Sequence, residues 1–524
     1  MKIEVIHVKK EKIWSVLSVL VWLALAAAEA LLGYRILQLD MLPAKYLALV
    51  FALLALTAVL IGLLMYQRRG KYQKKKRHIR QIIAYILSAL IIAACLIGSG
   101  AIAKVNTTIS NVTKTPTISA IVDVYVLTDD PAQSLADAKG YTFGVTDAYD
   151  WDNTQKTIAK LEDQFGQQIQ TVTHPSVFAM IDSLYAGETD ALILNSAYLG
   201  ILEEMEGYTD FADRTRLLHE QAIEEEVPEE TAPLKSIFSP KNDPAEQETG
   251  PEEADDSTSF IVYLSGSDTR RKILATSRSD VNILAVVNTE TKQVLLVNTP
   301  RDYYVSNPAG SGEMDKLTHC GLYGPECSAE ALATLYDTSI KYYAQINFTG
   351  FQTLIDAIGG VTVYSEIGFT TTHGKHFIQK GENHLNGSQA LGFARERYAF
   401  KAGDNSRGQN QMKIMKAVIE KLSSGTTIIS NYAEILDSLD GLFTTNMTQD
   451  EISQLVKMQL SDMANWNVQS VAATGTGGTD KTYATGGKYA YVMYPNEDVI
   501  AQISDLIDRV LDGEALTAED VVLN

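Results

Sequence analysis

Three long apolar runs open the chain and constrain its architecture more than any other feature. They cover roughly residues 13–37, 42–66 and 81–103. Each reaches the ~20 residues that a helix needs to cross the hydrocarbon core of a bilayer. A cleavable signal peptide is disfavoured, because two further apolar runs follow the first. We therefore predict that residues 1–103 form a three-span membrane anchor.

The charges around the apolar runs predict how this anchor is oriented. Lysines precede the first run, and the basic segment QRRGKYQKKKRHIR separates the second run from the third. Positively charged loops stay in the cytoplasm. We therefore expect a multi-pass protein of the cell membrane whose N-terminus is cytoplasmic. After three crossings, the large part beyond about residue 104 is expected outside the cytoplasm.

The distribution of charge also restricts the partners. The chain has a net charge of −20, and residues 1–80 hold 14 basic and four acidic side chains, which leaves about −30 for the remainder. Nucleic-acid affinity comes chiefly from basic side chains that neutralise phosphates. DNA and RNA are therefore disfavoured as partners. An anionic substrate needs a local basic pocket, which is feasible because salt screens the surrounding charge within roughly 8 Å.

Composition and periodicity divide the part beyond the membrane into four segments. Residues 104–118, rich in Thr, Ser and Asn, are expected to form a tether. Strand-like and helical stretches over 119–219 predict a small α/β accessory domain, for membrane spacing or partner contact. The acidic, proline-containing residues 220–258 are expected to form a linker. Strands interleaved with helices over 259–524 predict an α/β/α sandwich around a mixed sheet, as the catalytic domain.

Aspartate and arginine recur in five segments of this last domain, at expected strand ends and helix starts. The segments YLSGSDTR, RSDVNILAVVN, NTPRDYYV, ALGFARERYAF and GDNSRGQNQ supply Asp268, Arg270, Arg278, Asp280, Arg301, Asp302, Arg395, Arg397, Asp404, Arg407 and Gln411. Sheets of this class form their clefts at such positions. Carboxylates can hold Mg²⁺ and guanidiniums can bind phosphate oxygens in pairs, which would suit a diphosphate. Surface ion pairs are the alternative for each segment taken alone.

Several of these segments together resemble a known family. In this order, YLSGSDTR, RSDVNIL, NTPRDYYV, DKLTHCGLYG, NFTGFQTLIDAIGGV and GDNSRGQNQ resemble the LytR-CpsA-Psr domain, over roughly residues 258–425. The three-span anchor and the accessory domain are similar to its capsule-associated CpsA branch. Asn410 departs from the arginine that many family members carry before the glutamine, which removes one phosphate contact.

The resemblance implies a transferase of Gram-positive cell-wall biogenesis. Such an enzyme attaches a polyprenyl-diphosphate-linked glycopolymer, for example capsule or teichoic acid, to peptidoglycan and releases polyprenyl phosphate. Asp268 and Asp280 would bind Mg²⁺, with Mn²⁺ as the alternative ion. The residues expected to contact the diphosphate are Arg278, Arg301, Arg395, Arg397, Arg407 and Gln411, with Arg270 as a further candidate. Catalysis would rest on Arg278 and Arg301, and on Asp302 or Asp404 for proton removal.

Two other functions fit the same residues. The chain would be a lipid-diphosphate hydrolase if water replaced the sugar hydroxyl at the same site. Alternatively, it would be a non-catalytic regulator or scaffold whose partners are capsule-assembly proteins. Comparing the release of labelled donor with and without peptidoglycan separates the first alternative from a transferase.

Cysteine and histidine offer two further candidate features. Cys320 and Cys327 lie close together in HCGLYGPEC, where either a disulfide or a pair of buried thiols is consistent with the spacing. His373, His376 and His384 suggest a metal site, but an exposed loop is favoured because no carboxylate lies at a matching spacing.

Overall fold

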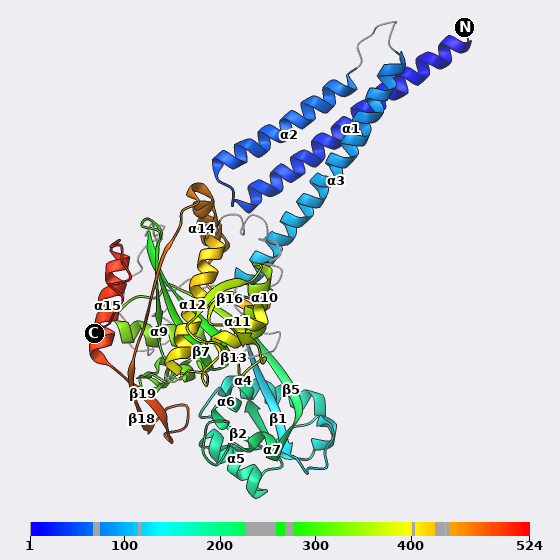
Figure 1. Cartoon of the computed structure of the whole chain (residues 1–524). Helices are drawn as coiled ribbons and strands as arrows, with labels where there is room; N and C mark the ends of the chain where they lie inside the picture. The colour runs from blue at the N-terminus through cyan, green and yellow to red at the C-terminus, as the bar shows by residue number, and fades with distance from the viewer. Residues whose placement is uncertain are drawn as a thin grey trace, which may run out of the picture. The chain divides into compact units, whose positions relative to one another are not determined.

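Figure 1 shows the protein as a computed structural model. It describes residues 2–66, 74–113, 117–226, 258–267, 276–400, 404–424, 435 and 441–523. The chain separates into two compact units. The first contains residues 1–111, 428–437 and 448–464, and the second contains residues 112–427, 438–447 and 465–524.

The three predicted membrane spans are three long helices of the first unit. They are α1 (Lys2–Leu39), α2 (Ala44–Met65) and α3 (Lys74–Thr113). Within them, Trp14–Leu39, Ala44–Met65 and Ile79–Ile109 are each long and apolar enough to cross a membrane. Glu29 of α1 is buried and accepts a hydrogen bond from Thr57 Oγ1 of α2 at 2.7 Å. The carboxylate therefore faces a neighbouring helix, as expected of an acidic residue in such a span.

The prediction that residues 104–118 form a tether is largely wrong. Helix α3 continues to Thr113, and strand β1 begins at Thr117. The hydroxyls of Thr107 and Thr108 donate to the carbonyl oxygens four residues earlier, at 3.0 and 3.1 Å. Because these hydroxyls are satisfied along the helix itself, a Thr-rich segment can remain helical.

The accessory domain is built on a five-stranded mixed sheet in the order β3-β2-β4-β1-β5. Its strands are β1 (Thr117–Leu127), β2 (Thr142–Thr146), β3 (Gln170–His174), β4 (Ala191–Asn195) and β5 (Thr215–Glu226). Its helices are α4 (Trp151–Phe165), α5 (Val177–Ala186), α6 (Leu199–Leu202) and α7 (Phe211–Arg214). β2 is parallel to β3 and β4, whereas β1 is antiparallel to β4 and β5.

Strand β5 corrects the start of the predicted acidic linker. The linker was expected from residue 220, but β5 runs to Glu226 and pairs with β1 along its whole length. Ile223 of this stretch is buried in the apolar core of the accessory domain. Pairing and burial together hold an acidic sequence in a strand, and residues 227–257 lie outside the described residues.

The larger domain is built on a six-stranded mixed sheet in the order β16-β11-β6-β7-β8-β17. Its strands are β6 (Ser259–Ser267), β7 (Ser279–Asn288), β8 (Gln293–Asn298), β11 (Tyr342–Asn347), β16 (Phe443–Thr445) and β17 (Asn467–Ala472). β7 lies between β6 and β8 and is antiparallel to both, whereas β11 is parallel to β6 and β17 is parallel to β8.

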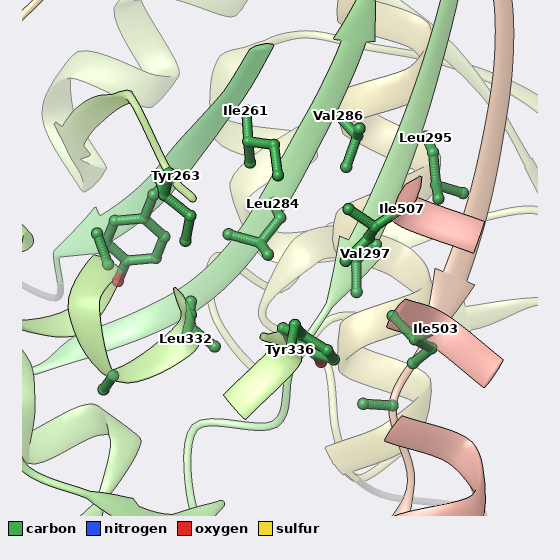
Figure 2. Close-up of a cluster of buried hydrophobic side chains, with 14 of the residues drawn as sticks. Ile261, Tyr263, Leu284, Val286, Leu295, Val297, Leu332, Tyr336, Ile503 and Ile507 are labelled. Atoms are coloured by element: carbon green, nitrogen blue, oxygen red, sulfur yellow. The ribbon is translucent and has the colours of Figure 1, made fainter. Parts of the chain in front are cut away.

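One face of this sheet is closed by an apolar core. Figure 2 shows Leu284 and Leu295 of the strands beside side chains of two helices, α9 (Pro325–Tyr336) and α15 (Glu497–Leu511). Tyr336, Ile503 and the strand residues are buried.

The opposite face packs against α12 (Asp404–Ser423). Ile283 and Leu296 of the strands form a second cluster with Met415 and Ile419 of this helix. Helices on both faces of a mixed sheet confirm the predicted α/β/α sandwich.

The remaining elements are short strands and connecting helices. They are β9 (Tyr304–Ser306), β10 (Met314–Lys316), α8 (Leu317–Cys320), α10 (Phe348–Ala357), β12 (Val361–Ser365), β13 (Phe369–Thr370), β14 (Phe377–Ile378), β15 (Gly381–Leu385), α11 (Gly387–Ala394), α14 (Gln449–Asp462), β18 (Gly475–Lys481) and β19 (Tyr489–Pro495).

Candidate active site

One edge of the six-stranded sheet brings the predicted basic side chains together. Arg278 directly precedes β7, and Arg301 closely follows β8. Because β7 and β8 are antiparallel, the start of one and the end of the other lie at the same edge. The other predicted phosphate-binding residues come from two further places. Arg395 and Arg397 follow α11, and Arg407 and Gln411 lie in the first turns of α12.

These side chains line one cavity of about 520 Å³. Its polar residues include Arg278, Asp280, Arg301, Arg395, Arg397, Arg407 and Gln411. Strands, α10 and α12 supply an apolar wall that includes Val281, Ile283, Ile346, Phe351, Ile414 and Val418. Guanidiniums beside an apolar wall suit a ligand that joins an anion to a hydrocarbon chain.

Arg301 is the centre of the ion pairs at this site. Its Nη1 lies 2.8 Å from Asp280 Oδ1, and its Nη2 lies 2.9 Å from Glu204 Oε1. The same Glu204 oxygen accepts from Arg278 Nη1 at 2.8 Å. The side chain of Arg301 is only 9% exposed, so these charges interact in a largely dehydrated setting.

The ion pairs fix the charge states of the three groups. Burial alone would raise the pKa of the Asp280 carboxyl, but Arg301, Arg407 and Arg278 together lower it. Burial likewise opposes ionisation of Glu204, yet Arg301, Arg278 and Lys316 lower the pKa of its carboxyl to about 2. The pKa of Arg301 is raised by Asp280, Asp302 and Glu204, against the effect of burial. Guanidiniums and carboxylates are therefore all charged at neutral pH.

Asp302 lies beside the cluster. Its Oδ1 is 3.3 Å from Lys316 Nζ, and its Oδ2 is 3.7 Å from Arg301 Nε. It lines a neighbouring polar cavity that also contains Arg301 and Lys316. Asp302 is therefore held between Lys316 and Arg301, at the edge of the group of ion pairs.

The expected metal ligands are only partly within the described residues. Asp268 and Arg270 lie outside them, and of Asp404 the structure describes its position at the start of α12 but not its side chain. Asp280 offers an ionised, hard oxygen donor in the wall of the cavity, which fits one ligand of Mg²⁺. Within the described ranges, no group of three His, Cys, Asp or Glu side chains is arranged to hold a metal.

The disulfide interpretation is not supported. Cys320, at the end of α8, and Cys327, on α9, are both buried free thiols. Cys320 Sγ lies 3.9 Å from the Lys316 carbonyl oxygen, and Cys327 Sγ lies 3.5 Å from Asn307 Oδ1. A hydrogen bond with Cys327, together with burial, raises the pKa of the Cys320 thiol.

The three histidines do not converge on one site. His373 lines the large cavity, whereas His376 Nε2 lies 2.9 Å from Ser388 Oγ. His384 Nδ1 lies 3.2 Å from Thr362 Oγ1. These separate surroundings agree with the loop interpretation rather than with a shared metal.

Two charged residues at the site were missed by sequence reasoning. Lys316 lies within the segment DKLTHCGLYG, so its place in a family motif could have identified it. Glu204 lies just after α6 of the accessory domain. The sequence predicted that this stretch is helical, but the observed helix ends after one turn, at Leu202. Nothing in LEEMEG distinguishes Glu204 from its acidic neighbours, because its role comes from how two domains pack.

Comparisons with a family model and with curated relatives point to one protein family. The model of the LytR_cpsA_psr family matches residues 219–504. The chain is 34% identical over 197 residues to the polyisoprenyl-teichoic acid–peptidoglycan teichoic acid transferase TagU of Bacillus cereus, covering 37% of this chain and 63% of that protein. A TagU of Enterococcus faecalis is 33% identical over 198 residues, covering 37% of this chain and 64% of that protein. The chain thus spans less than two thirds of the length of these two relatives.

Two solved structures each align with 50% of the chain. TagV of B. subtilis aligns with a TM-score of 0.41 and 23% identity, over 50% of this chain and 99% of TagV. TagT bound to LI-WTA aligns with a TM-score of 0.40 and 25% identity, over 50% of this chain and 95% of TagT.

Proposed function

The chain belongs to the LytR-CpsA-Psr family, and we propose that it transfers a polyprenyl-diphosphate-linked glycopolymer to peptidoglycan and releases polyprenyl phosphate. The names of the TagU relatives, which specify transfer of teichoic acid to peptidoglycan, support this assignment. The polymer is a capsular polysaccharide, a teichoic acid or a similar wall polymer. Capsule-assembly proteins remain its predicted partners.

The observation that carries the proposal is the composition of the large cavity. Five arginines and Gln411 meet an apolar wall within about 520 Å³. Charge-assisted hydrogen bonds from guanidiniums hold the diphosphate. The apolar wall takes the prenyl chain, and each CH₂ group removed from water contributes about 0.8 kcal/mol. A soluble sugar phosphate would leave this apolar wall uncovered.

The proposed reaction is a phosphoryl transfer. A hydroxyl oxygen of the acceptor attacks the glycan-side phosphorus and forms a new P–O bond. The bond from that phosphorus to the bridging oxygen breaks, and polyprenyl phosphate leaves with the electron pair. Asp302 takes the hydroxyl proton. Arg301 and Arg278 stabilise the negative charge that develops on the phosphate oxygens, which is usually the largest contribution in such reactions.

Mg²⁺, or Mn²⁺ in its place, is proposed as the cofactor, with Asp280 and Asp268 as its protein ligands. When bound, the ion neutralises further charge on the phosphate oxygens. Asp280 remains ionised beside the cavity because three arginines lower its pKa against the effect of burial.

The proposed orientation has a cytoplasmic N-terminus and an extracytoplasmic catalytic domain. The basic segment at residues 68–80 favours the cytoplasmic side. Helix α14, from the C-terminal part of the chain, contacts the connection between α1 and α2, where Lys457 Nζ lies 2.9 Å from Asp40 Oδ1. That connection is at the opposite end of α2 from the basic segment. Both observations support the same orientation.

The test uses the full-length chain in detergent with labelled polyprenyl-diphosphate glycan and soluble peptidoglycan strands. We expect labelled glycan to become linked to peptidoglycan through a phosphodiester. Arg301→Ala should lower this rate by at least about 100-fold, because it removes a donor to the developing charge.

Arg214→Ala is the matched control. Arg214 is 43% exposed on the accessory domain, where its partner Asp210 lies 4.0 Å away. Its loss should leave transfer unchanged. Release of label at the full rate without peptidoglycan would instead indicate a hydrolase. Normal transfer by Arg301→Ala would contradict the proposed role of the cavity.

A further inference from the structure

A second cavity of about 300 Å³ adjoins the proposed donor site. The two cavities share Glu204, Arg301 and Arg397 in their walls. The second one lacks the apolar wall of the first and is lined, besides Arg397, by several separate parts of the second unit. These parts are residues 201–206 of the accessory domain, the segments around Arg301 and Lys316, and the β18–β19 hairpin.

The position of this cavity matters for a transfer reaction. A molecule in the second cavity touches the same guanidinium, Arg301, that would hold the donor phosphate. The attacking oxygen must reach phosphorus roughly in line with the leaving oxygen, so it needs an approach separate from the lipid-filled wall. Asp302, the proposed proton acceptor, lines the second cavity and is absent from the walls of the first.

The lining of the second cavity suits a sugar. Carboxylates, Lys316 and His319 offer hydrogen-bond donors and acceptors, and Asp315 Oδ1 holds His319 Nδ1 at 2.6 Å in a fixed orientation. Tyr489 and Tyr491 alternate along β19, so both project from the same side of the strand. They are 64% and 52% exposed. Exposed aromatic faces beside convergent polar groups are suited to a pyranose ring, and the volume is enough for a sugar unit.

The accessory domain is firmly packed where it lines this cavity. Tyr198 OH donates to the Ala484 carbonyl oxygen in the hairpin turn at 2.9 Å, and Tyr149 OH donates to the Leu322 carbonyl oxygen at 3.0 Å. Leu322 and Ala484 are buried in the same apolar cluster as the accessory-domain side chains. At Gly200 a Cβ atom would lie 2.6 Å from Arg278 Cζ, so the missing side chain lets that guanidinium approach the domain.

We propose that this second cavity binds the acceptor sugar and that the accessory domain is a structural part of the acceptor subsite. Residues 201–206 form one wall, the β18–β19 tyrosines form another, and Glu204 separates the acceptor from the donor phosphate. This inference rests on the proposed function, because an acceptor is required only if the chain is a transferase.

The test combines Tyr489→Ala with Tyr491→Ala in the full-length chain. With a soluble peptidoglycan oligosaccharide as the acceptor, we expect KM for this acceptor to rise at least tenfold. Binding of the labelled donor should stay within twofold of the unaltered chain, because neither tyrosine lines the first cavity. Both side chains are exposed, so the double variant is expected to fold.

Tyr364→Ala is the matched control, since Tyr364 is 54% exposed on β12 and lines neither cavity. It should leave both constants unchanged. Glu204→Gln tests the accessory-domain wall separately and should also alter KM for the acceptor. Unchanged KM in the tyrosine double variant and in Glu204→Gln would overturn the inference while transfer itself stands. No transfer by the unaltered chain, with tyrosine-dependent binding of the oligosaccharide, would refute the transferase and leave the second cavity as a sugar-binding site without an acceptor role.

Discussion

The two faces of the six-stranded sheet use alternate residues of the same strands for different purposes. On one face, Leu284 and Val286 of β7 lie in a core closed by α9 and α15 (Figure 2). On the other, Val281 and Ile283 of the same strand line the cavity of about 520 Å³. The strand therefore provides packing on one side and ligand space on the other. Substitutions on the two faces should separate stability from activity.

The largest effect is expected from Leu284→Ala on the packed face. Leu284 is 0% exposed, and its truncation leaves a void that the surrounding core cannot fill. We expect a loss of about 3 kcal/mol in the free energy of unfolding, with donor affinity retained in the folded protein. Thermal unfolding and donor binding measure the two quantities. If Leu284→Ala lost donor affinity without a change in stability, the two faces would not have the separate roles described above.

Arg407→Ala should act on the cavity face alone. Arg407 opens α12 and lines the cavity beside Asp280. We expect kcat/KM for transfer to fall about 100-fold, equivalent to about 2.7 kcal/mol. Arg407→Lys should recover only part of the loss, because an ammonium group lacks the paired donors of a guanidinium. Equal activity in both variants and the unaltered chain would remove Arg407 from the site.

Removal of divalent cations should also affect only the cavity face. Treatment with a chelator is expected to lower the transfer rate at least about tenfold, with Mg²⁺ restoring it. The unfolding temperature should change little, since the packed face contains no proposed ligand. An undiminished rate after chelation would show that the arginines alone stabilise the phosphate charge.

The smallest effect is expected from Val281→Phe, which adds volume to the cavity wall. We expect donor affinity to weaken about fivefold and the free energy of unfolding to change by less than about 1 kcal/mol, because the cavity has room for the ring. Leu284→Phe is the matched control on the packed face, where the same ring should cost about 1–3 kcal/mol. If Val281→Phe destabilised the fold more than Leu284→Phe, the cavity would have to be closed in solution.

Much of this arrangement could be predicted from local sequence. The three apolar runs predict the spans, and alternating strands and helices predict the sandwich. Arg278 and Arg301 were singled out because they flank strand-like runs, and the family resemblance gave them a phosphate-binding role. The antiparallel pairing of β7 and β8, which brings both to one edge, is seen only in the structure.

The remainder depends on packing between distant segments. Glu204 reaches Arg278 and Arg301 only because the accessory domain packs onto the larger one, and no periodicity encodes that contact. The composition of residues 220–226 predicted a linker, yet these residues pair with β1 and form a strand. Cys320 and Cys327 have the spacing of a small loop, but they lie in the core as two buried free thiols.

The central claim is that one cavity grips the phosphates with arginines and the prenyl chain with its apolar wall. A crystal structure of the full-length chain with a bound polyprenyl diphosphate tests this most directly. We predict phosphate oxygens about 3 Å from the guanidiniums of Arg301 and Arg407, with the hydrocarbon chain between α12 and the sheet. A diphosphate bound away from these arginines, or a hydrocarbon chain outside the cavity, would contradict the account.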